Sequence, residues 1–214
     1  YNMDCMDGMK QFPDKYFELA IVDPPYGIGE KFKGGKSGKM NFNEIVNKKW
    51  DSPPDNTYFN ELMRVSKNQI IWGGNYFNLK PTRFFIVWNK LIAEDFSLAM
   101  CEYAWTSFDK LAKIFTYCNP KTKKIHPTQK PVALYEWLLH NYAKKGDKIL
   151  DTHVGGASSL IACHKLGFDY VGFELDPDYY KAATERLEAV KAQVSLFDEP
   201  EPTEQWEQVS LYDT

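Results

Sequence analysis

The stretch "KILDTHVGGASSLIACHKLGFDYVGFELDPDYY", residues 148–180, decides the fold. Its first apolar strand ends at Asp151. A turn of small residues with Gly155 and Gly156 then opens a helix, and a second apolar strand ends at Glu174. Two short strands joined by a helix are typical of a parallel βαβ unit. The stretch therefore predicts an α/β fold.

The rest of the chain repeats this alternation. Several apolar runs are nearly continuous, as in a parallel sheet that is buried on both faces. The pattern predicts a doubly wound, mostly parallel sheet. The expected strands are 18–22, 69–72, 84–88, 102–106, 148–150 and 170–173, and the expected helices are 57–65, 132–142, 158–166 and 177–194. Asp176 is the candidate N-cap of the last helix, with Pro177 in its first turn.

Composition places the 214-residue chain among globular proteins. Hydrophobic residues make up 43% and charged residues 26%, which are ordinary values for a domain with a core. Aromatic residues make up 15%, which fits either a Trp-rich core or a site that stacks flat ligands. The four cysteines are scattered without CxxC pairing, so neither a disulfide framework nor a metal site is expected.

Neither a membrane segment nor a secretory signal is expected. No apolar run approaches the roughly 20 residues that span a bilayer. No charged, apolar and small-residue signal pattern opens the chain. These features favour a reducing, cytoplasmic location.

The net charge of −3 is unevenly distributed. Residues 194–214 hold six acidic residues and neither Lys nor Arg; without them, 23 acidic residues face 26 basic ones, a net charge of +3. A positive body gives weak support to polyanion binding. The basic residues gather in two groups: Lys31, Lys33, Lys36 and Lys39, and Lys121, Lys123, Lys124 and Lys130.

These shifts in composition predict one domain, 1–193, followed by an acidic flexible tail, 194–214. Residues 27–56 are rich in Gly, Lys and Asn, and residues 107–131 are polar and basic, so both are expected as loops. The tail repeats itself as "QVSLFD" (193–198) and "QVSLYD" (208–213).

The stretch "AIVDPPYGIG", residues 20–29, carries the chemistry. A buried strand runs into Asp23, Pro24, Pro25 and Tyr26. The two prolines fix φ and remove two backbone donors, so a carbonyl stays free beside the carboxylate. A plain strand-ending turn is the alternative interpretation.

The βαβ unit of residues 148–180 also has a ligand-binding interpretation. Small residues in the turn let a ligand approach the backbone, and Glu174 at the end of the second strand suits ribose hydroxyls. GxGxxG is absent and no Lys follows the turn, which favours a nucleoside cofactor without a pyrophosphate. An α/β unit without a ligand remains the alternative.

Four segments together resemble the S-adenosylmethionine-dependent amino-group DNA methyltransferases. They are "DPPY" (23–26), "HPTQKPVALYEWLL" (126–139), "LDTHVGGASS" (150–159) and "VGFELDPDYY" (171–180). The catalytic motif precedes the cofactor loop, as in the permuted β group, and "NQIIWGGNYF" and "EYAWTSF" are similar to phage-type adenine methylases. The resemblance covers about 1–190. It implies a seven-stranded Rossmann-like sheet with a small inserted DNA-recognition region, in about 27–56 and 89–131.

The resemblance implies a catalytic role for the tetrapeptide. The Asp23 carboxylate and the Pro24 carbonyl accept the two N–H groups of a nucleobase amine, which localises the nitrogen lone pair for attack on a methyl sulfonium. Pro25 fixes the backbone, and Tyr26 stacks on a base flipped out of double-stranded DNA. An Asp23 that is buried in an ion pair, or directed away from the cofactor loop, would contradict this role.

The resemblance also implies S-adenosylmethionine as the cofactor. Asp4 would face the adenine, Glu174 the ribose, and Asp151 the methionine part or its own loop, with Thr128 and Lys130 near the methionine carboxylate. The full set of expected contacts is Asp4, Cys5, Asp23, Thr128, Lys130, Asp151, His153, Gly155, Ser158, Glu174 and Leu175. The loop departs from the family pattern Asp-Pro-Phe-x-Gly-Ser-Gly-Thr: Thr152 and His153 replace Pro-Phe, Gly156 replaces Ser and Ala157 replaces the second Gly.

The implied function is site-specific adenine-N6 methylation, because Asp opens the tetrapeptide. Cytosine-N4 methylation and a non-catalytic, methyltransferase-like DNA- or partner-binding subunit are the alternatives. The basic segments 31–39 and 110–130 are the candidates to hold DNA phosphates. The tail repeats resemble peptides that dock on a replication sliding clamp; packing of the first repeat on the chain's own domain is the alternative.

Overall fold

The computed structural model describes residues 1–27, 52–94, 99–118 and 124–197. The strands in these ranges form one seven-stranded sheet in the order β5-β3-β4-β2-β1-β6-β7. Neighbouring strands run parallel, except that β4 is antiparallel to β2 and to β3. This confirms the predicted doubly wound, mostly parallel sheet. The strands are β1 Phe17–Val22, β2 Ser66–Trp72, β3 Phe85–Asn89, β4 Cys101–Thr106, β5 Lys113–Thr116, β6 Lys148–Asp151 and β7 Asp169–Gly172.

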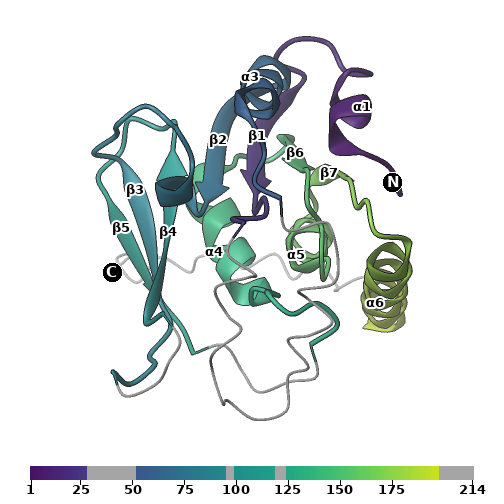
Figure 1. The fold of residues 1–214 in the computed structure, drawn as a ribbon. Coiled ribbons are helices and arrows are strands. Elements are labelled where there is room, and N and C mark those ends of the chain that lie inside the picture. Colours follow the sequence, from purple (N-terminus) through teal and green to yellow (C-terminus); the bar gives the residue numbers. More distant parts are fainter. Residues whose placement is uncertain (28–51, 95–98, 119–123, 198–214) are drawn as a thin grey trace, which may run out of the picture.

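Helices cover both faces of this sheet (Figure 1). Strand β1 shows why: Leu19 and Ile21 pack in the core that α4 and α5 cover, whereas Ala20 and Val22 pack in the core that α1 and α3 cover. Alternate side chains of a strand point to opposite faces, so a strand buried twice must be apolar throughout. The helices are α1 Cys5–Met9, α3 Asn56–Val65, the 3₁₀ turn η2 Gly74–Tyr76, α4 Val132–Tyr142, α5 Ser158–Lys165 and α6 Pro177–Phe197.

Two predictions for the irregular segments need correction. Composition predicts a loop at 107–131, but β5 lies inside this range and pairs in parallel with β3. Three of the four residues of β5 are exposed and only Phe115 is partly buried, so the strand lacks the apolar pattern of a buried strand. Composition also ends the last helix at residue 194, whereas α6 continues to Phe197. All but the last residue of "QVSLFD" is therefore helical.

Several expected features lie outside the described residues: the second tail repeat, the lysines at 31–39, and Lys121 and Lys123. Of the predicted loop 27–56, the structure describes its first residue and residues 52–56. Asp55 there caps α3 by accepting from the backbone N–H groups of Thr57 and Tyr58. Asp176 accepts from the N–H groups of Asp178 and Tyr179, which confirms it as the cap of α6.

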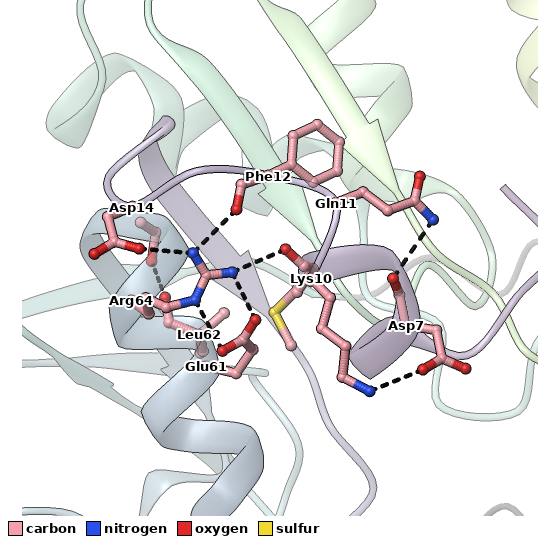
Figure 2. Close-up of polar contacts among 10 residues, drawn as sticks. Asp7, Lys10, Gln11, Phe12, Asp14, Glu61, Leu62 and Arg64 are labelled. Atoms are coloured by element: carbon pink, nitrogen blue, oxygen red, sulfur yellow. Dashed lines mark hydrogen bonds and ion pairs between the residues drawn. The ribbon is translucent and has the colours of Figure 1, made fainter.

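Arg64 ties the N-terminal segment to α3 (Figure 2). Its guanidinium group donates to the backbone carbonyls of Met9 and Phe12 at 3.1 and 3.0 Å, to Asp14 at 2.7 Å, and to Glu61 on its own helix at 2.6 and 2.9 Å. The two carbonyls lie at the end of α1 and in the turn after it, where helix geometry leaves acceptors without partners. Arg64 therefore fixes where β1 begins relative to α3.

We expect Arg64→Met to lower the free energy of unfolding by about 1–3 kcal/mol, because it removes charge-assisted hydrogen bonds to backbone acceptors. Lys10→Met is the matched control: its ion pair with Asp7 is about two-thirds exposed on both sides, so its loss should leave the free energy of unfolding nearly unchanged. Urea denaturation measures both. Equal losses in the two variants would contradict the role given to Arg64.

Candidate active site

Three acidic residues meet at the carboxyl edge of the sheet. Strands β1, β6 and β7 are adjacent and parallel, so the residues that follow them gather at one edge. Asp23 follows β1, Asp151 ends β6, and Glu174 lies two residues beyond β7. The charges of Asp23 and Glu174 both reach Asp151 and act to raise its pKa. The structure thus brings together the two motifs that the sequence predicts to cooperate.

Asp23 is held by two donors. Its Oδ1 accepts from the Tyr26 hydroxyl at 2.6 Å, and its Oδ2 lies 2.5 Å from Nζ of Lys130. Its side chain is 16% exposed. Asp23 is therefore in a largely buried ion pair, which is the arrangement that the sequence argument sets against its role as an amine acceptor. Each carboxylate oxygen has two lone-pair sites, so each keeps one for a further donor.

Lys130 is not placed as expected from the sequence. Its side chain is 3% exposed and bridges Asp23 and Glu102, with Nζ 3.0 Å from Oε2 of Glu102. The other oxygen of Glu102 lies 2.6 Å from Nζ of Lys90. The sequence predicts Lys130 near the methionine carboxylate, but in the structure two protein carboxylates already surround its ammonium group.

Burial and charge act in opposite directions on these groups. Burial would raise the pKa of Glu102, but the charges of Lys130 and Lys90 outweigh it and lower this pKa to about 2. Burial would lower the pKa of Lys130, but the charges of Asp23 and Glu102 raise it instead. Glu102 and Lys130 are therefore both ionised at neutral pH.

Tyr26 is enclosed on several sides. Its ring stacks on Tyr76 at a centroid distance of 4.8 Å and 12° between planes. Gly73 lies against the same ring: a Cβ there would come within 2.2 Å of it, and Gly73 also has φ +67°. Only glycine satisfies both conditions. Burial raises the pKa of Tyr26 well above its usual value, so the hydroxyl remains protonated and donates to Asp23.

Tyr76 therefore occupies a ring face of Tyr26 on which the sequence argument places the flipped base. Tyr76 is 50% exposed and belongs to η2, directly after the buried end of β2. The sequence analysis did not single it out. The pair of glycines before it, in "WGGNYF", is the signal that marks a close approach of backbone to another group.

Asp151 is turned towards its own loop. Its Oδ1 accepts from the backbone N–H of His153 at 3.0 Å, and its Oδ2 accepts from the Ser159 hydroxyl. The side chain is buried, and burial raises its pKa to about 7. Of the two placements that the sequence left open, the structure thus has Asp151 against the loop.

Glu174 holds the glycine turn from the other side. Its oxygens accept from the backbone N–H groups of Gly155 at 2.8 Å and Asp176 at 3.0 Å. Burial raises the pKa of Glu174, and a parallel bridge places Asn2 beside it. This bridge brings the first residues of the chain to the carboxyl edge.

Asp4 and Cys5 follow this bridge. The Asp4 side chain is exposed and caps α1 by accepting from the Met6 N–H at 2.7 Å. Cys5 is half-buried; burial and the nearby charges of Asp4 and Glu174 raise its pKa to about 12, so it is a thiol and not a thiolate. Its environment is not that of a reactive cysteine.

The turn before α5 is strained at one residue. Gly155 has φ +52° and Ala157 has φ +59°. A left-handed conformation costs a non-glycine residue roughly 1–2 kcal/mol. Having Ala157 where the family has glycine therefore destabilises the folded turn. The Ala157 methyl group is buried against Val154 and Ala183, which offsets part of this cost.

Arg186 of α6 supports the same turn. Its guanidinium group donates to the Gly156 carbonyl and, at 3.1 Å, to the hydroxyl of the buried Ser158. The sequence analysis missed Arg186, because an arginine in an amphipathic helix looks like a solvated charge.

His153 belongs to a buried polar chain. The Tyr58 hydroxyl lies 2.6 Å from Oγ1 of Thr152, and that oxygen lies 2.9 Å from Nδ1 of His153. The two replacements of the family's Pro-Phe thus bond to each other and to α3. Burial lowers the pKa of His153 to about 4, so the imidazole is neutral at neutral pH.

The remaining predicted residues line the same edge less tightly. Pro24 is buried and Pro25 half-buried after β1. Thr128 is exposed, and its hydroxyl lies 3.1 Å from Nδ1 of His126. Leu175 is 60% exposed beside Glu174.

Two lysines of the predicted phosphate-binding segment 110–130 lie elsewhere. Lys110 and Lys113 bond to the backbone and side-chain oxygens of Asn141, near the end of α4. Ser107, just after β4, bonds to Gln69 in the middle of β2. Because β4 runs antiparallel to β2, the chain after Ser107 approaches the amino edge of the sheet, opposite Asp23. Lys124, in contrast, lies close enough to Lys90 and Glu102 for their charges to act on its pKa.

The described residues contain no group of three or more His, Cys, Asp or Glu side chains arranged to hold a metal ion. Within the same ranges, none of the helices has the length and apolar character required to cross a bilayer.

Comparison with solved structures defines the class of fold. The structure matches the M1.HpyAVI–SAM complex with a TM-score of 0.56 and 20% identity, over 87% of this chain and 97% of that one. It matches the cytosine-N4-specific PvuII DNA methyltransferase with a TM-score of 0.58 and 13% identity, over 91% of both chains. The fold is that of the Rossmann-like methyltransferases.

Sequence comparisons lead to the family. The family model described as DNA methylase (N6_N4_Mtase) matches residues 83–185. The type II methyltransferase M.HpaI of Haemophilus parainfluenzae is 23% identical over 87% of this chain and 73% of its own length. The chain is therefore similar in sequence to DNA amino-methyltransferases, which confirms the resemblance that its motifs indicate.

We expect His153→Phe, which restores the family's residue, to make stability less sensitive to acid. In the wild type the unfolded chain binds a proton at His153 below pH 6.5, whereas the folded chain binds it only near pH 4. Stability therefore falls as the pH drops through this window, by up to about 3 kcal/mol at 1.36 kcal/mol per unit of pKa shift.

The measurement is urea unfolding of both proteins at intervals from pH 4 to 7. Asp151 titrates in the same range with the opposite sign, because its folded pKa is raised, but it is present in both proteins and cancels in the difference. A difference that stays constant across this window would show that His153 does not resist protonation.

Proposed function

We propose that the protein transfers a methyl group from S-adenosylmethionine to the N6 amino group of adenine in double-stranded DNA. The observation that supports this most is the meeting of the Asp-Pro-Pro-Tyr corner with the glycine turn and Glu174 at one edge of the sheet. The relationship to DNA amino-methyltransferases supports the class of reaction. Asp, and not Ser, at position 23 favours adenine over cytosine.

The residues at this edge fit the proposed cofactor. Glu174 keeps one lone-pair site on each oxygen after binding two backbone N–H groups, and ribose hydroxyls are donors. Asp4 is exposed, and its Oδ2 can accept a further donor. Leu175, next to Glu174 in the chain, offers an exposed apolar surface. Together these groups match a cofactor that carries ribose, a flat base and a positive charge.

When bound, S-adenosylmethionine would supply the electrophilic methyl group. The chain's own residues must then activate a poor nucleophile, because the lone pair of an aromatic amine is delocalised into the ring. A free lone pair on an Asp23 oxygen and the Pro24 carbonyl would accept the two N–H groups. Acceptors that fit the tetrahedral nitrogen better than the planar one stabilise the transition state.

We assign Asp23 as a hydrogen-bond acceptor and not as a general base. One lone-pair site of its Oδ2 faces the ammonium group of Lys130 at 2.5 Å, and each of its oxygens keeps one site for an N–H donor. The amine proton is therefore proposed to leave after methyl transfer, when the nitrogen carries a positive charge. Hydrogen-bond acceptance needs no net proton transfer and is compatible with the ion pair.

The flipped base would enter beside Tyr26 and Tyr76. Because Tyr76 covers a face of Tyr26 in this structure, the base would either displace it or stack on its exposed side. Extrusion from a duplex costs a few kcal/mol, which stacking on such a ring partly offsets.

We expect Asp23→Ala to reduce methyl transfer at least about 100-fold, because it removes one of the two acceptors. The assay incubates the protein with labelled S-adenosylmethionine and duplex DNA of mixed sequence, digests the DNA and identifies the labelled nucleoside. Asp7→Ala, at a 68% exposed carboxylate, is the matched control and should retain activity.

Label in N6-methyladenosine that is lost in Asp23→Ala supports the proposal. Label in N4-methylcytosine would show that the target base is cytosine and not adenine. A wild-type protein that binds S-adenosylhomocysteine but labels no DNA would contradict catalysis and favour a non-catalytic DNA-binding subunit.

A further inference from the structure

Lys130 is the most completely buried cation that the structure describes near the candidate active site. Its side chain is 3% exposed, and its ammonium group lies 2.5 Å from Asp23 and 3.0 Å from Glu102. The same group lies 5.4 Å from the ring centre of Trp72 and 5.9 Å from that of Tyr26. Burying an ammonium group is costly unless it is paired and bonded. Here both carboxylates and both rings surround it.

The geometry points to Lys130 as a positioning residue for Asp23. We propose that its ammonium group holds the Asp23 carboxylate in one orientation, and that it does not bind the methionine carboxylate of the cofactor. This inference rests on the proposed function. It differs from the role that the sequence predicts for Lys130.

The charges joined by ion pairs support this assignment. Asp23 and Glu102 pair with Lys130 and Lys90, so two carboxylates face two ammonium groups within these contacts. A third carboxylate, from the cofactor, would have to enter this cluster at the ammonium group that is already shared. Removing Lys130 instead leaves two carboxylates with a single cation, which bonds only Glu102.

The orientation of Asp23 follows from its two donors. Lys130 engages Oδ2 and the Tyr26 hydroxyl engages Oδ1, so the carboxylate plane cannot rotate without breaking one of the contacts. A hydrogen-bond acceptor acts in the transition state only if its lone pair is already aimed at the donor. Lys130 supplies the only positive charge among the described contacts of this carboxylate.

The test compares Lys130→Met with the wild type in two measurements that separate the roles. S-adenosylhomocysteine carries the same amino-acid carboxylate but no transferable methyl group, and calorimetry gives its Kd. We expect this Kd to stay within about twofold and kcat for DNA methylation to fall at least about tenfold, as for loss of one charge-assisted contact. A Kd that rises tenfold or more would overturn the inference in favour of cofactor binding.

The pH profile provides a readout that a general loss of structure would not move. The titratable groups on which the charge of Asp23 acts are Tyr26, Tyr58, Lys130, Tyr135 and Asp151, with Glu102 on the same ammonium group of Lys130, and the three tyrosines remain protonated. Without the ammonium group, Glu102 loses the largest of the charges that lower its pKa, so Glu102 takes up a proton at a higher pH. The acidic limb of the kcat profile should therefore move up by at least about one pH unit. An unmoved limb contradicts the inference.

Lys165→Met is the matched control, because Lys165 forms a 45% exposed ion pair with Glu136 on the outer surface. It should change neither Kd nor kcat. If Lys130→Met does not fold, Lys130→Gln keeps a donor of similar shape without the charge and should give the same acidic shift.

A double-mutant cycle tests the contact between Lys130 and Asp23 through stability, so it requires no measurement of enzyme activity. Asp23→Asn should change the unfolding free energy differently in the wild type and in Lys130→Met, because the two side chains interact directly. Additive effects would overturn the inference even if the wild type is an active methyltransferase. Coupled effects in a wild type that methylates no DNA would instead remove the proposed function and leave the contact standing.

Discussion

The pairing of β1 with β6 is the constraint on which the candidate site depends. Ala20 lies beside Leu150 in a parallel register, and this single alignment brings Asp23 next to Asp151 although most of the chain separates them. Asp151 in turn pairs with Gly172 of β7, which carries Glu174 to the same edge. A slip of one residue would exchange Leu19 and Ile21 with the smaller Ala20 and Val22 between the two cores. The two cores therefore fix the register, and the register fixes the chemistry.

Polar contacts then adjust what the sheet positions. Glu174 and Arg186 bind different parts of the glycine turn: Glu174 accepts from Gly155, and Arg186 donates to Gly156 and Ser158. Asp151 binds the start of the same turn through the His153 N–H. Such buried groups are costly when they are left unpaired, so each of them holds the loop to one conformation.

Much of the fold and part of the site follow from the sequence for physical reasons. Continuous apolar runs predicted β1 and β6 because a strand that is buried on both faces admits little else, and Asp176 marked the start of α6 through a local rule. The short β5 was not predicted because three of its four residues are exposed and leave no pattern. The partner of Lys130 could not be predicted, because "HPTQKP" contains no trace of Glu102 on β4 or of the packing around Trp72. The roles of Arg186 and Tyr76 likewise depend on contacts with residues that are distant in sequence.

Paired strands in the two parts of the sheet differ in how far apart they lie along the chain. Asn89 of β3 pairs with Cys101 of β4, which is close to it along the chain. Strands β1 and β6 pair across most of the length of the chain. Loop closure costs entropy before native contacts repay it, so local pairings form faster. The β3–β4 hairpin, which carries Glu102 and Lys90, is thus expected to assemble ahead of the β1–β6 seam. Half of the charged cluster would then be in place before Asp23 arrives during folding.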